Sequence, residues 1–277
     1  MDIPISVTKL INDAIEEDLG HGDITTDLLV PVESKSTALY IAKDNFILAG
    51  MPFAKEVFRL IDSATYFEAF YNEGAEVQKG DVLGKVDGKT RALFAGERVS
   101  LNIMQRLSGI ATTTNRFIEA VGGTKAKIVD TRKTTPCLRF MEKYAVRLGG
   151  GSNHRFGLFD GILIKDNHIE AVGSIRKAVA LAKMGPHLAR IEMEVETLKE
   201  LQEAVEAGVD IVMLDNMSLD NMREAVRIAD GKVTVEASGN ITLDNVREVA
   251  GTGVDIISVG ALTHSVTAAD ISMKIVK

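Results

Sequence analysis

The chain has 277 residues, 45% of them hydrophobic, and a formal net charge of −7. This length can form one large domain with a full hydrophobic core, or two smaller domains. The net negative charge excludes a general electrostatic attraction to nucleic acid or to an anionic membrane, so an anion site needs a local cluster of basic residues. The single cysteine, Cys137, excludes an internal disulfide framework and a cysteine-based metal site.

The sequence contains no recognisable targeting signal. Its N-terminal residues lack a basic region followed by an apolar core, and no apolar run approaches the roughly 18 residues of a transmembrane helix. We therefore expect a cytoplasmic enzyme.

The N-terminal part of the chain mixes helical and strand-like patterns. Apolar residues at helical spacing predict helices over residues 10–19 and 52–61. Strand-like runs, separated by glycine-containing turns, occur at residues 37–42, 64–71 and 82–86. A long helical pattern follows over residues 92–120, and the pair Ser108 and Gly109 is expected to interrupt it. These patterns predict a small α+β unit.

From residue 126 onward, short apolar strands alternate with amphipathic helical segments. The predicted strands cover residues 127–130, 161–164, 191–195, 210–214, 232–235 and 255–259. Several of the helices between them begin with a capping residue, at Thr197, Ser218 and Thr242. Glu194, Asp215 and Glu236 are placed at consecutive strand ends, at intervals of 21 residues. Six or seven such units predict an α/β fold with a parallel β/α barrel, incomplete because eight units need about 250 residues.

A β/α barrel places its ligand site on the residues that directly follow the strands. Along this chain these residues are first basic, then acidic and finally small: Arg132, Lys133, Lys165, Glu194, Asp215, Ser238, Gly239, Asn240 and Gly260. The two acids could hold a magnesium ion, which prefers oxygen ligands and is commonly completed by substrate phosphates. The small residues would let the backbone approach a phosphate group closely.

A second basic cluster, Asn153, His154 and Arg155, lies between the first two of these strands. Taken singly, each basic residue could be a solvated cation, and each acid could be the salt-bridge partner of a lysine. Taken together, they indicate a terminal phosphate, a magnesium-bound polyphosphate and a second, strongly anionic reactant. Phosphoribosyl pyrophosphate with a dicarboxylate has all three features. Cys137 has no obvious partner base, so we interpret it as a packing residue.

Six motifs resemble those of the quinolinate phosphoribosyltransferase family, whose enzymes are also called nicotinate-nucleotide pyrophosphorylases (carboxylating). They are Glu97-Arg98 with Leu101-Asn102, Ser108–Thr113, Asp130–Pro136, Gly150–Arg155, Ile164–His168 and Glu236–Ile241. The likeness runs from residue 17 to residue 261. It implies an N-terminal α/β sandwich domain over residues 1–108, with the tail 265–277 packing back on it, and an open β/α barrel domain over residues 109–264.

The resemblance also implies roles for individual residues. Substrate would be bound by Arg98, Thr131, Arg132, Lys133, His154, Arg155 and Lys165. The phosphate would lie at Ser238, Gly239, Asn240 and Gly260, and magnesium at Glu194 and Asp215. Both acids would be catalytic, together with Lys133 and Lys165. The enzyme would be a homodimer, with Arg98 of one subunit reaching the barrel of the other, and could assemble further.

The reaction implied by the resemblance transfers phosphoribosyl from phosphoribosyl pyrophosphate to the ring nitrogen of quinolinate. With loss of CO2 it yields nicotinate mononucleotide and pyrophosphate in NAD biosynthesis. A related enzyme could act on another acceptor, such as nicotinate or that of the molybdenum-transport-associated relative. A non-catalytic phosphate sensor or a carrier module is the other class considered. Residues 73–86 resemble half of a biotinyl or lipoyl carrier domain, but they lack the methionine-flanked lysine that carries the prosthetic group.

Overall fold

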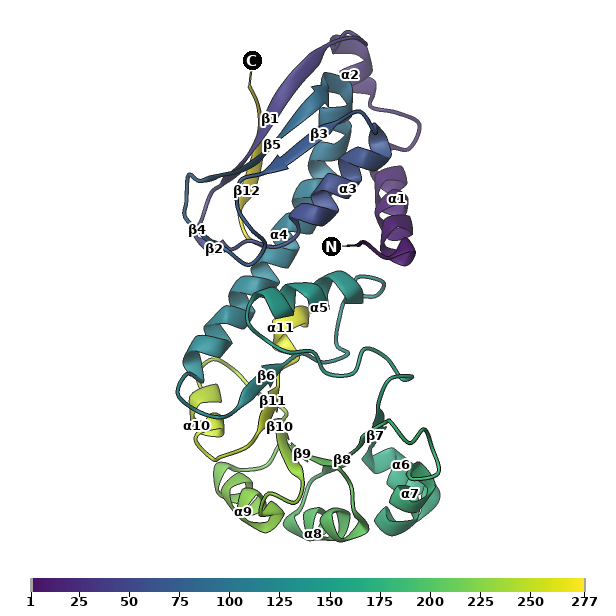
Figure 1. Ribbon diagram of the computed structural model, residues 1–277, viewed down its shortest axis with the longest axis vertical. Helices are drawn as coiled ribbons and strands as arrows, with labels where there is room; N and C mark the ends of the chain where they lie inside the picture. Colours follow the sequence, from purple (N-terminus) through teal and green to yellow (C-terminus); the bar gives the residue numbers. More distant parts are fainter. Residues whose placement is uncertain (1, 277) are drawn as a thin grey trace. The chain divides into compact units, whose positions relative to one another are not determined.

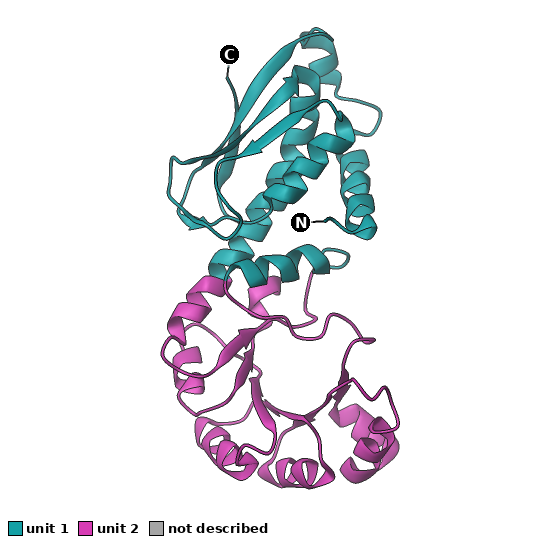
Figure 2. Ribbon diagram, in the orientation of Figure 1, with its two compact units in different colours: residues 1–113, 136–149, 266–277 teal, residues 114–135, 150–265 magenta. Residues whose placement is uncertain are grey.

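The computed structural model describes residues 2–276 and divides into two compact units, which are coloured separately in Figure 2. Unit 1 comprises Met1–Thr113, Pro136–Gly149 and Val266–Lys277, and unit 2 comprises Thr114–Thr135 and Gly150–Ser265. This division differs from the sequence-based one because residues 136–149, between two barrel strands in the sequence, belong to unit 1.

Unit 1 is built on a four-stranded antiparallel sheet in the order β12-β1-β5-β3 (Figure 1). Its strands are β1 (Lys35–Ala42), β3 (Tyr66–Ala69), β5 (Val82–Lys89) and β12 (Ile271–Val276), and a short ribbon pairs β2 (Phe46–Ile47) with β4 (Glu76–Val77). Its helices are α1 (Ile5–Leu19), α2 (Ile24–Leu29), α3 (Met51–Ile61), α5 (Arg139–Leu148) and most of α4 (Thr90–Ala120). The predicted strands and helices of this region are thus confirmed. Pairing of β12 with β1 makes the C-terminal segment an edge strand of this sheet.

The core of unit 1 lies between its sheet and its helices. Alternate residues of β1 are buried, as expected for a strand with one face on a hydrophobic core. Tyr40 of this strand is fully buried and shares a 2.5 Å hydrogen bond with Ser100 of α4, so its hydroxyl is satisfied within the core. Arg106, also on α4, donates to the fully buried Glu142 at 2.5 Å, which gives this arginine a structural partner.

Helix α4 runs through 31 residues without a break, so the predicted interruption at Ser108 and Gly109 was wrong. The glycine serves close packing instead. A Cβ on Gly109 would lie 2.2 Å from the carbonyl oxygen of Thr267, so no side chain fits where the C-terminal segment crosses the helix. Glycine costs about 1 kcal/mol relative to alanine in a helix interior, and this close approach explains why it is present.

Unit 2 is an open parallel β/α barrel, which confirms the predicted fold class. Its six-stranded sheet has the order β6-β11-β10-β9-β8-β7 and curves with helices outside it (Figure 1). The strands are β6 (Lys127–Val129), β7 (Ile162–Ile164), β8 (Ile191–Val195), β9 (Ile211–Asp215), β10 (Thr234–Ser238) and β11 (Ile256–Ser258). All six match predicted strands. Because β6 and β7 form opposite edges, and do not pair with each other in the described part of the chain, the barrel is not closed.

The helices of unit 2 begin largely where their caps predict. They are α6 (Asp166–Val172), α7 (Ile175–Ala182), α8 (Leu198–Ala207), α9 (Leu219–Ala229), α10 (Val246–Ala250) and α11 (Ala261–His264). Thr197 forms the predicted capping box and Ser218 the predicted hydroxyl cap. The predicted cap at Thr242 was wrong, because Asn245 accepts from the Thr242 N–H and α10 starts only after it. No helix within residues 2–276 has the length and apolar character needed to cross a membrane.

Candidate active site

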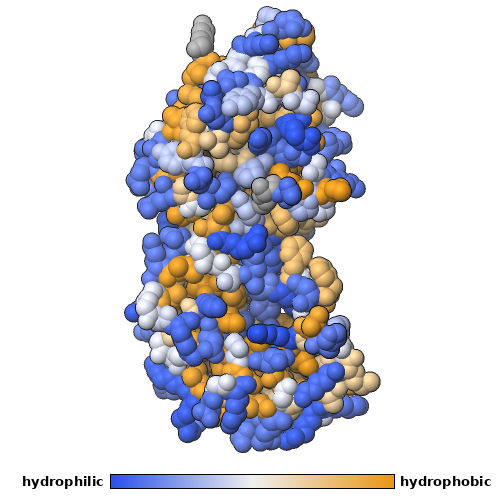
Figure 3. Space-filling model, in the orientation of Figure 1, coloured by the Kyte–Doolittle hydropathy of each residue, from blue (hydrophilic) through white to orange (hydrophobic). Residues whose placement is uncertain are grey.

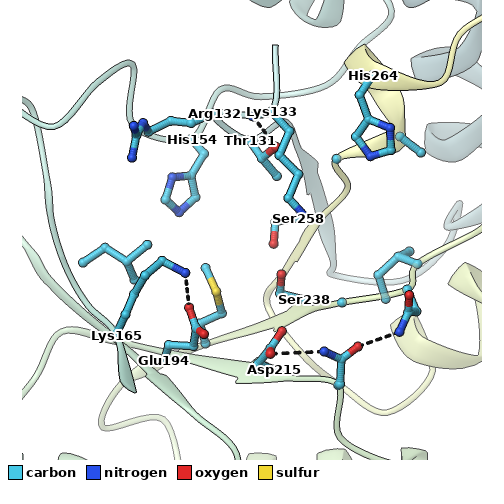
Figure 4. A pocket seen from close by; sticks show the side chains of 18 of the residues that line it. Thr131, Arg132, Lys133, His154, Lys165, Glu194, Asp215, Ser238, Ser258 and His264 are labelled. Atoms are coloured by element: carbon cyan, nitrogen blue, oxygen red, sulfur yellow. Dashed lines mark hydrogen bonds and ion pairs between the residues drawn. The ribbon is translucent and has the colours of Figure 1, made fainter. Parts of the chain in front are cut away.

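A cavity of 670 Å³ lies within unit 2, where the carboxyl ends of the barrel strands meet. Among the residues that line it are all the predicted site residues of the barrel: Thr131, Arg132, Lys133, His154, Arg155, Lys165, Glu194, Asp215, Ser238, Gly239, Asn240 and Gly260. In Figure 4, Arg132, Lys133 and His154 come from one side of the view, and Lys165, Glu194 and Asp215 from the other. Arg98 does not line this cavity; it is exposed on α4 in unit 1.

Sequence reasoning missed several residues that line the same cavity: Leu163, Met213, Asn216, Ile241, Thr242, Ser258 and His264. His264 closes the short helix α11, directly after the last strand. Its position four residues beyond Gly260 was the available signal for it. Asn216 could have been found in the same way, because it directly follows Asp215 at the end of β9.

Asp130 joins the two basic clusters, which lie more than twenty residues apart in the sequence. Its fully buried carboxylate accepts from the His154 backbone N–H at 2.9 Å and from the Asn153 amide at 2.7 Å. An isolated parallel bridge between Val129 and Ser152 aligns the same two segments. Asp130 therefore positions the loop that carries His154 and Arg155 beside the end of β6.

Two guanidinium groups lie close together on this basic side. Burial lowers the pKa of Arg155, and the nearby positive charge of Arg132 lowers it further. Arg155 also donates to the carbonyl oxygen of Gly161 at 3.0 Å, which fixes its orientation. Because the exposed Arg132 and the partly buried Arg155 carry like charges, an anion bound between them would relieve their repulsion. The arrangement is suited to carboxylate groups, which arginine binds with two parallel hydrogen bonds.

Inside the barrel, His154 meets two buried carboxylates. Its Nε2 lies 2.9 Å from Glu192 Oε2 and 3.8 Å from Glu236 Oε1. Burial, and secondly the charge of Glu192, raise the pKa of Glu236 to about 7, against an opposing effect of His154. These three side chains have the donor types of a metal site, with one ligand atom of each within 4.8 Å of the others.

Glu236 is not at a strand end, so that part of the 21-residue pattern was wrong. It occupies the middle of β10 and pairs in register with Met213, whereas Ser238 pairs with Asp215. The spacing failed because β10 extends two residues beyond Glu236. Its side chain consequently lies in the barrel interior, where 1% of its surface is exposed.

The acidic side of the cavity carries ion pairs and hydrogen bonds of its own. Lys165 Nζ forms an ion pair with Glu194 Oε2, and Asp215 Oδ2 accepts from the Asn216 amide at 3.1 Å. The side chain of Lys133 passes close to Gly260, where an added Cβ would lie 3.1 Å from Lys133 Cδ. Cys137, in contrast, is exposed and has a φ of 66°, so its interpretation as a packing residue was wrong.

Models of known protein families match almost the entire chain. The N-terminal domain of quinolinate phosphoribosyl transferase matches residues 23–108, and its C-terminal domain matches residues 110–274. The chain belongs to the quinolinate phosphoribosyltransferase family. A probable nicotinate-nucleotide pyrophosphorylase (carboxylating) of Bacillus subtilis is 46% identical over 272 residues, covering 98% of this chain and 94% of that protein. Quinolinate phosphoribosyltransferase (decarboxylating) 2a of Nicotiana tabacum is 42% identical, covering 95% of this chain and 80% of that protein.

Solved structures agree with this family membership. NadC from Streptococcus pyogenes superposes with a TM-score of 0.96 at 41% identity, covering 100% of this chain and 99% of that one. The nicotinate-nucleotide pyrophosphorylase of Francisella tularensis gives 0.95 at 42%, covering 99% and 98%. Human nicotinic acid phosphoribosyltransferase, at 13% identity and a TM-score of 0.65, covers 100% of this chain and 74% of that one. This last likeness concerns the fold alone, so the fold by itself does not select the acceptor.

Proposed function

We infer that this protein transfers phosphoribosyl from phosphoribosyl pyrophosphate to the ring nitrogen of quinolinate. The product loses CO2, giving nicotinate mononucleotide and pyrophosphate in NAD biosynthesis. Relatives at 42–46% identity are named for this activity. Within this chain, the proposal rests on Arg132 and Arg155 lying together on the wall of a cavity that Glu194 and Asp215 also line. The two arginines suit a dicarboxylate acceptor. The two carboxylates suit the positive charge that develops on the ribose in the transition state.

We assign recognition of the acceptor to the basic side of the cavity together with Lys165, which comes from the acidic side (Figure 4). Arg132, Arg155, His154 and Lys165 would receive the two carboxylates of quinolinate, which leaves its ring nitrogen to attack C1 of the ribose. Arg98, which lies in unit 1, would come from the second subunit. A monocarboxylate such as nicotinate would make fewer charge-assisted hydrogen bonds with these residues than a dicarboxylate does. Selectivity for quinolinate would follow from the bonds that only the second carboxylate can make.

Departure of pyrophosphate develops positive charge on the ribose, and the carboxylates of Glu194 and Asp215 would stabilise that charge. Lys133 would contact the leaving pyrophosphate, while Ser238, Gly239 and Asn240, with Gly260, would hold the terminal phosphate. After attack, the electron pair of the breaking C2–carboxylate bond stays on C2, where the positive charge of the adjacent quaternised ring nitrogen stabilises it. CO2 leaves and a proton then replaces it at C2.

Magnesium is the metal that we propose for Glu194 and Asp215. Both side chains line the cavity and offer the oxygen donors that this ion prefers, and phosphate oxygens and water would complete its coordination. Asp215 uses only Oδ2 for Asn216, and Glu194 uses only Oε2 for Lys165. One oxygen of each carboxylate thus has no partner in these contacts, which fits metal binding. When bound, magnesium would stabilise the leaving pyrophosphate as a Lewis acid.

We also propose a homodimer in which Arg98 of one subunit completes the cavity of the other. The face seen in Figure 3 mixes apolar patches with hydrophilic side chains. Exposed large apolar residues include Ile24, Leu28 and Leu29 of α2, a surface that a second subunit could cover. Mixing Arg98→Ala with Arg155→Ala subunits tests this directly. Each mixed dimer has one intact site of two, and about half of the dimers in an equimolar mixture are mixed, so the mixture should recover about a quarter of wild-type activity; no recovery would refute the shared site.

The reaction is tested by supplying magnesium, phosphoribosyl pyrophosphate and either quinolinate or nicotinate, and by measuring CO2 and mononucleotide. Product should form with quinolinate only. Turnover of nicotinate would favour the alternative acceptor instead. Arg132→Ala and Arg155→Ala should each abolish use of quinolinate while leaving the oligomer intact, and near-normal quinolinate affinity in either variant would refute the assignment. A cytoplasmic location remains a prediction, which cell fractionation can test.

A further inference from the structure

A chain of side-chain hydrogen bonds links the phosphate loop, residues Ser238–Asn240, to Asp215. The connecting residue is Asn216, which has no role in the reaction proposed above. Asn240 Nδ2 donates to Asn216 Oδ1 at 2.9 Å, and Asn216 Nδ2 donates to Asp215 Oδ2 at 3.1 Å (Figure 4). The Asn216 backbone N–H also donates to the Ser238 carbonyl oxygen at 3.0 Å. Asn216 thus contacts the ends of both β9 and β10.

The backbone of this region is held in an uncommon conformation. Asn216 and Asn240 have φ angles of 53° and 52°, and they are two of four non-glycine residues with positive φ among residues 2–276. Gly239, between Ser238 and Asn240, has a φ of 91°. Such conformations cost roughly 1–3 kcal/mol each for residues other than glycine and persist at sites where the surrounding structure requires them. Asparagine and glycine adopt the left-handed region more readily than other residues, so this backbone favours those residue types at positions 216 and 240.

The Asn216 side chain packs tightly against Gly239. A Cβ on Gly239 would lie 2.2 Å from Oδ1 of Asn216, so the Asn216 amide fills the space that any side chain at position 239 would need. Glycine at this position keeps the path from Asn240 to Asn216 open. The phosphate loop is therefore shaped around the Asn216 side chain.

An amide group suits this position chemically because it donates and accepts at the same time. The Asp215 carboxylate, when ionised, only accepts, which assigns Asn216 Nδ2 to Asp215 and leaves Oδ1 to receive the Asn240 amide. Aspartate at position 216 could accept from Asn240 but would place a second carboxylate against Asp215. Aliphatic residues could do neither.

We propose that Asn216 is a positioning residue that couples a terminal phosphate in the Ser238–Asn240 loop to the orientation of the Asp215 carboxylate. This inference rests on the proposed function, because that reaction supplies a donor with a terminal phosphate. A phosphate that fixes the Asn240 side chain also fixes that of Asn216. Asn216 in turn holds Asp215 Oδ2, which leaves Oδ1 oriented toward the ribose and magnesium. Binding of the remote phosphate is thereby used to organise a group at the reacting centre.

The test compares Asn216→Gly with the wild type. Glycine keeps the left-handed backbone and removes only the amide, and Asp230→Gly is the matched control because Asp230 is exposed with a φ of 46°. We expect Asn216→Gly to lower kcat with phosphoribosyl pyrophosphate by about tenfold or more, the loss of one hydrogen bond to a charged group. The quinolinate affinity of Asn216→Gly, measured calorimetrically, should stay within about twofold of wild type. In the Asp230→Gly control, both kcat and quinolinate affinity should stay within about twofold of wild type. Unchanged kcat, or an equal loss of quinolinate affinity, would overturn the proposal.

A donor without the terminal phosphate, ribose 1-pyrophosphate, separates coupling from simple support of Asp215. Wild type and Asn216→Gly should differ by less than about twofold with this donor, since no phosphate reaches the loop. An undiminished tenfold difference would overturn the coupling. Calorimetric binding of both donors with magnesium gives a readout independent of turnover. The terminal phosphate should add less affinity in Asn216→Gly than in the wild type, even if the acceptor proves not to be quinolinate; an equal gain in both proteins would overturn the coupling.

Discussion

Replacing Glu236 by glutamine should stabilise this protein at alkaline pH. Glu236 is buried beside Glu192, and its pKa rises from 4.5 to about 7 in the folded state. The folded protein therefore binds this proton more tightly than the unfolded chain does. Ionisation of Glu236 therefore lowers the free energy of unfolding as pH rises from 4.5, the pKa in the unfolded chain, to about 7, the pKa in the folded protein. Above pH 7 the full loss is present. Glutamine keeps the shape and removes the charge.

The magnitude follows from the two pKa values. One pKa unit corresponds to about 1.4 kcal/mol, so the stability gained by Glu236→Gln should be about 1 kcal/mol at pH 5 and about 3 kcal/mol at pH 8. For a protein of this size, 1 kcal/mol shifts the melting temperature by roughly 2–4 °C. The pH dependence is the informative part, since a simple packing effect would be nearly constant with pH.

Urea-induced unfolding at pH 5 and pH 8, followed by circular dichroism, measures this difference. Glu248→Gln is the matched control, because Glu248 is exposed on α10 and should give the same small effect at both values. If the effect of Glu236→Gln is the same at pH 5 and pH 8, or less favourable at pH 8, the raised pKa of Glu236 is refuted.

Three further predictions concern close packing and recognition. Arg155→Lys should weaken quinolinate binding by more than about tenfold in calorimetry although the charge is kept, because lysine cannot make the paired hydrogen bonds of a guanidinium; affinity within twofold of wild type would contradict this. Gly239→Ala should raise the KM for phosphoribosyl pyrophosphate, because its Cβ would meet the Asn216 amide at 2.2 Å; an unchanged KM would mean that the loop adjusts freely. Gly109→Ala should lower the melting temperature although alanine favours helix by about 1 kcal/mol, because the Cβ would meet Thr267; a higher melting temperature would show that the crossing relaxes.

Relatives that share this fold are named for different acceptors. Nicotinic acid phosphoribosyltransferase from humans shares the fold at 13% identity, while relatives above 40% identity carry names that specify quinolinate or the carboxylating reaction. The shared fold therefore does not fix the acceptor. Arg132 and Arg155 are the residues on which we expect the choice of acceptor to depend, since both lie on the basic side of the cavity.

The sequence by itself determined the features that depend on neighbouring residues. Six barrel strands were predicted from short apolar runs, and the caps at Thr197 and Ser218 were predicted from chemistry within one helical turn. Because parallel strands end at one edge of a sheet, the site residues of the barrel could be collected without coordinates. The nine residues collected in this way all line one cavity. Local periodicity and strand direction were sufficient for these nine, whereas His154 and Arg155 came from a separate basic cluster and Thr131 from the family resemblance.

Only the tertiary structure decided the features that depend on contacts between distant segments. Gly109 reads as a helix breaker until the carbonyl of Thr267 is found 2.2 Å from its missing Cβ. Glu236 reads as a strand end until the register of β10 turns it into the barrel interior beside His154. Asn216 is one asparagine among several until it is seen between Asn240 and Asp215. Spacing along a chain fixes which face a residue occupies, but burial and hydrogen-bond partners are fixed by segments that the local pattern does not contain.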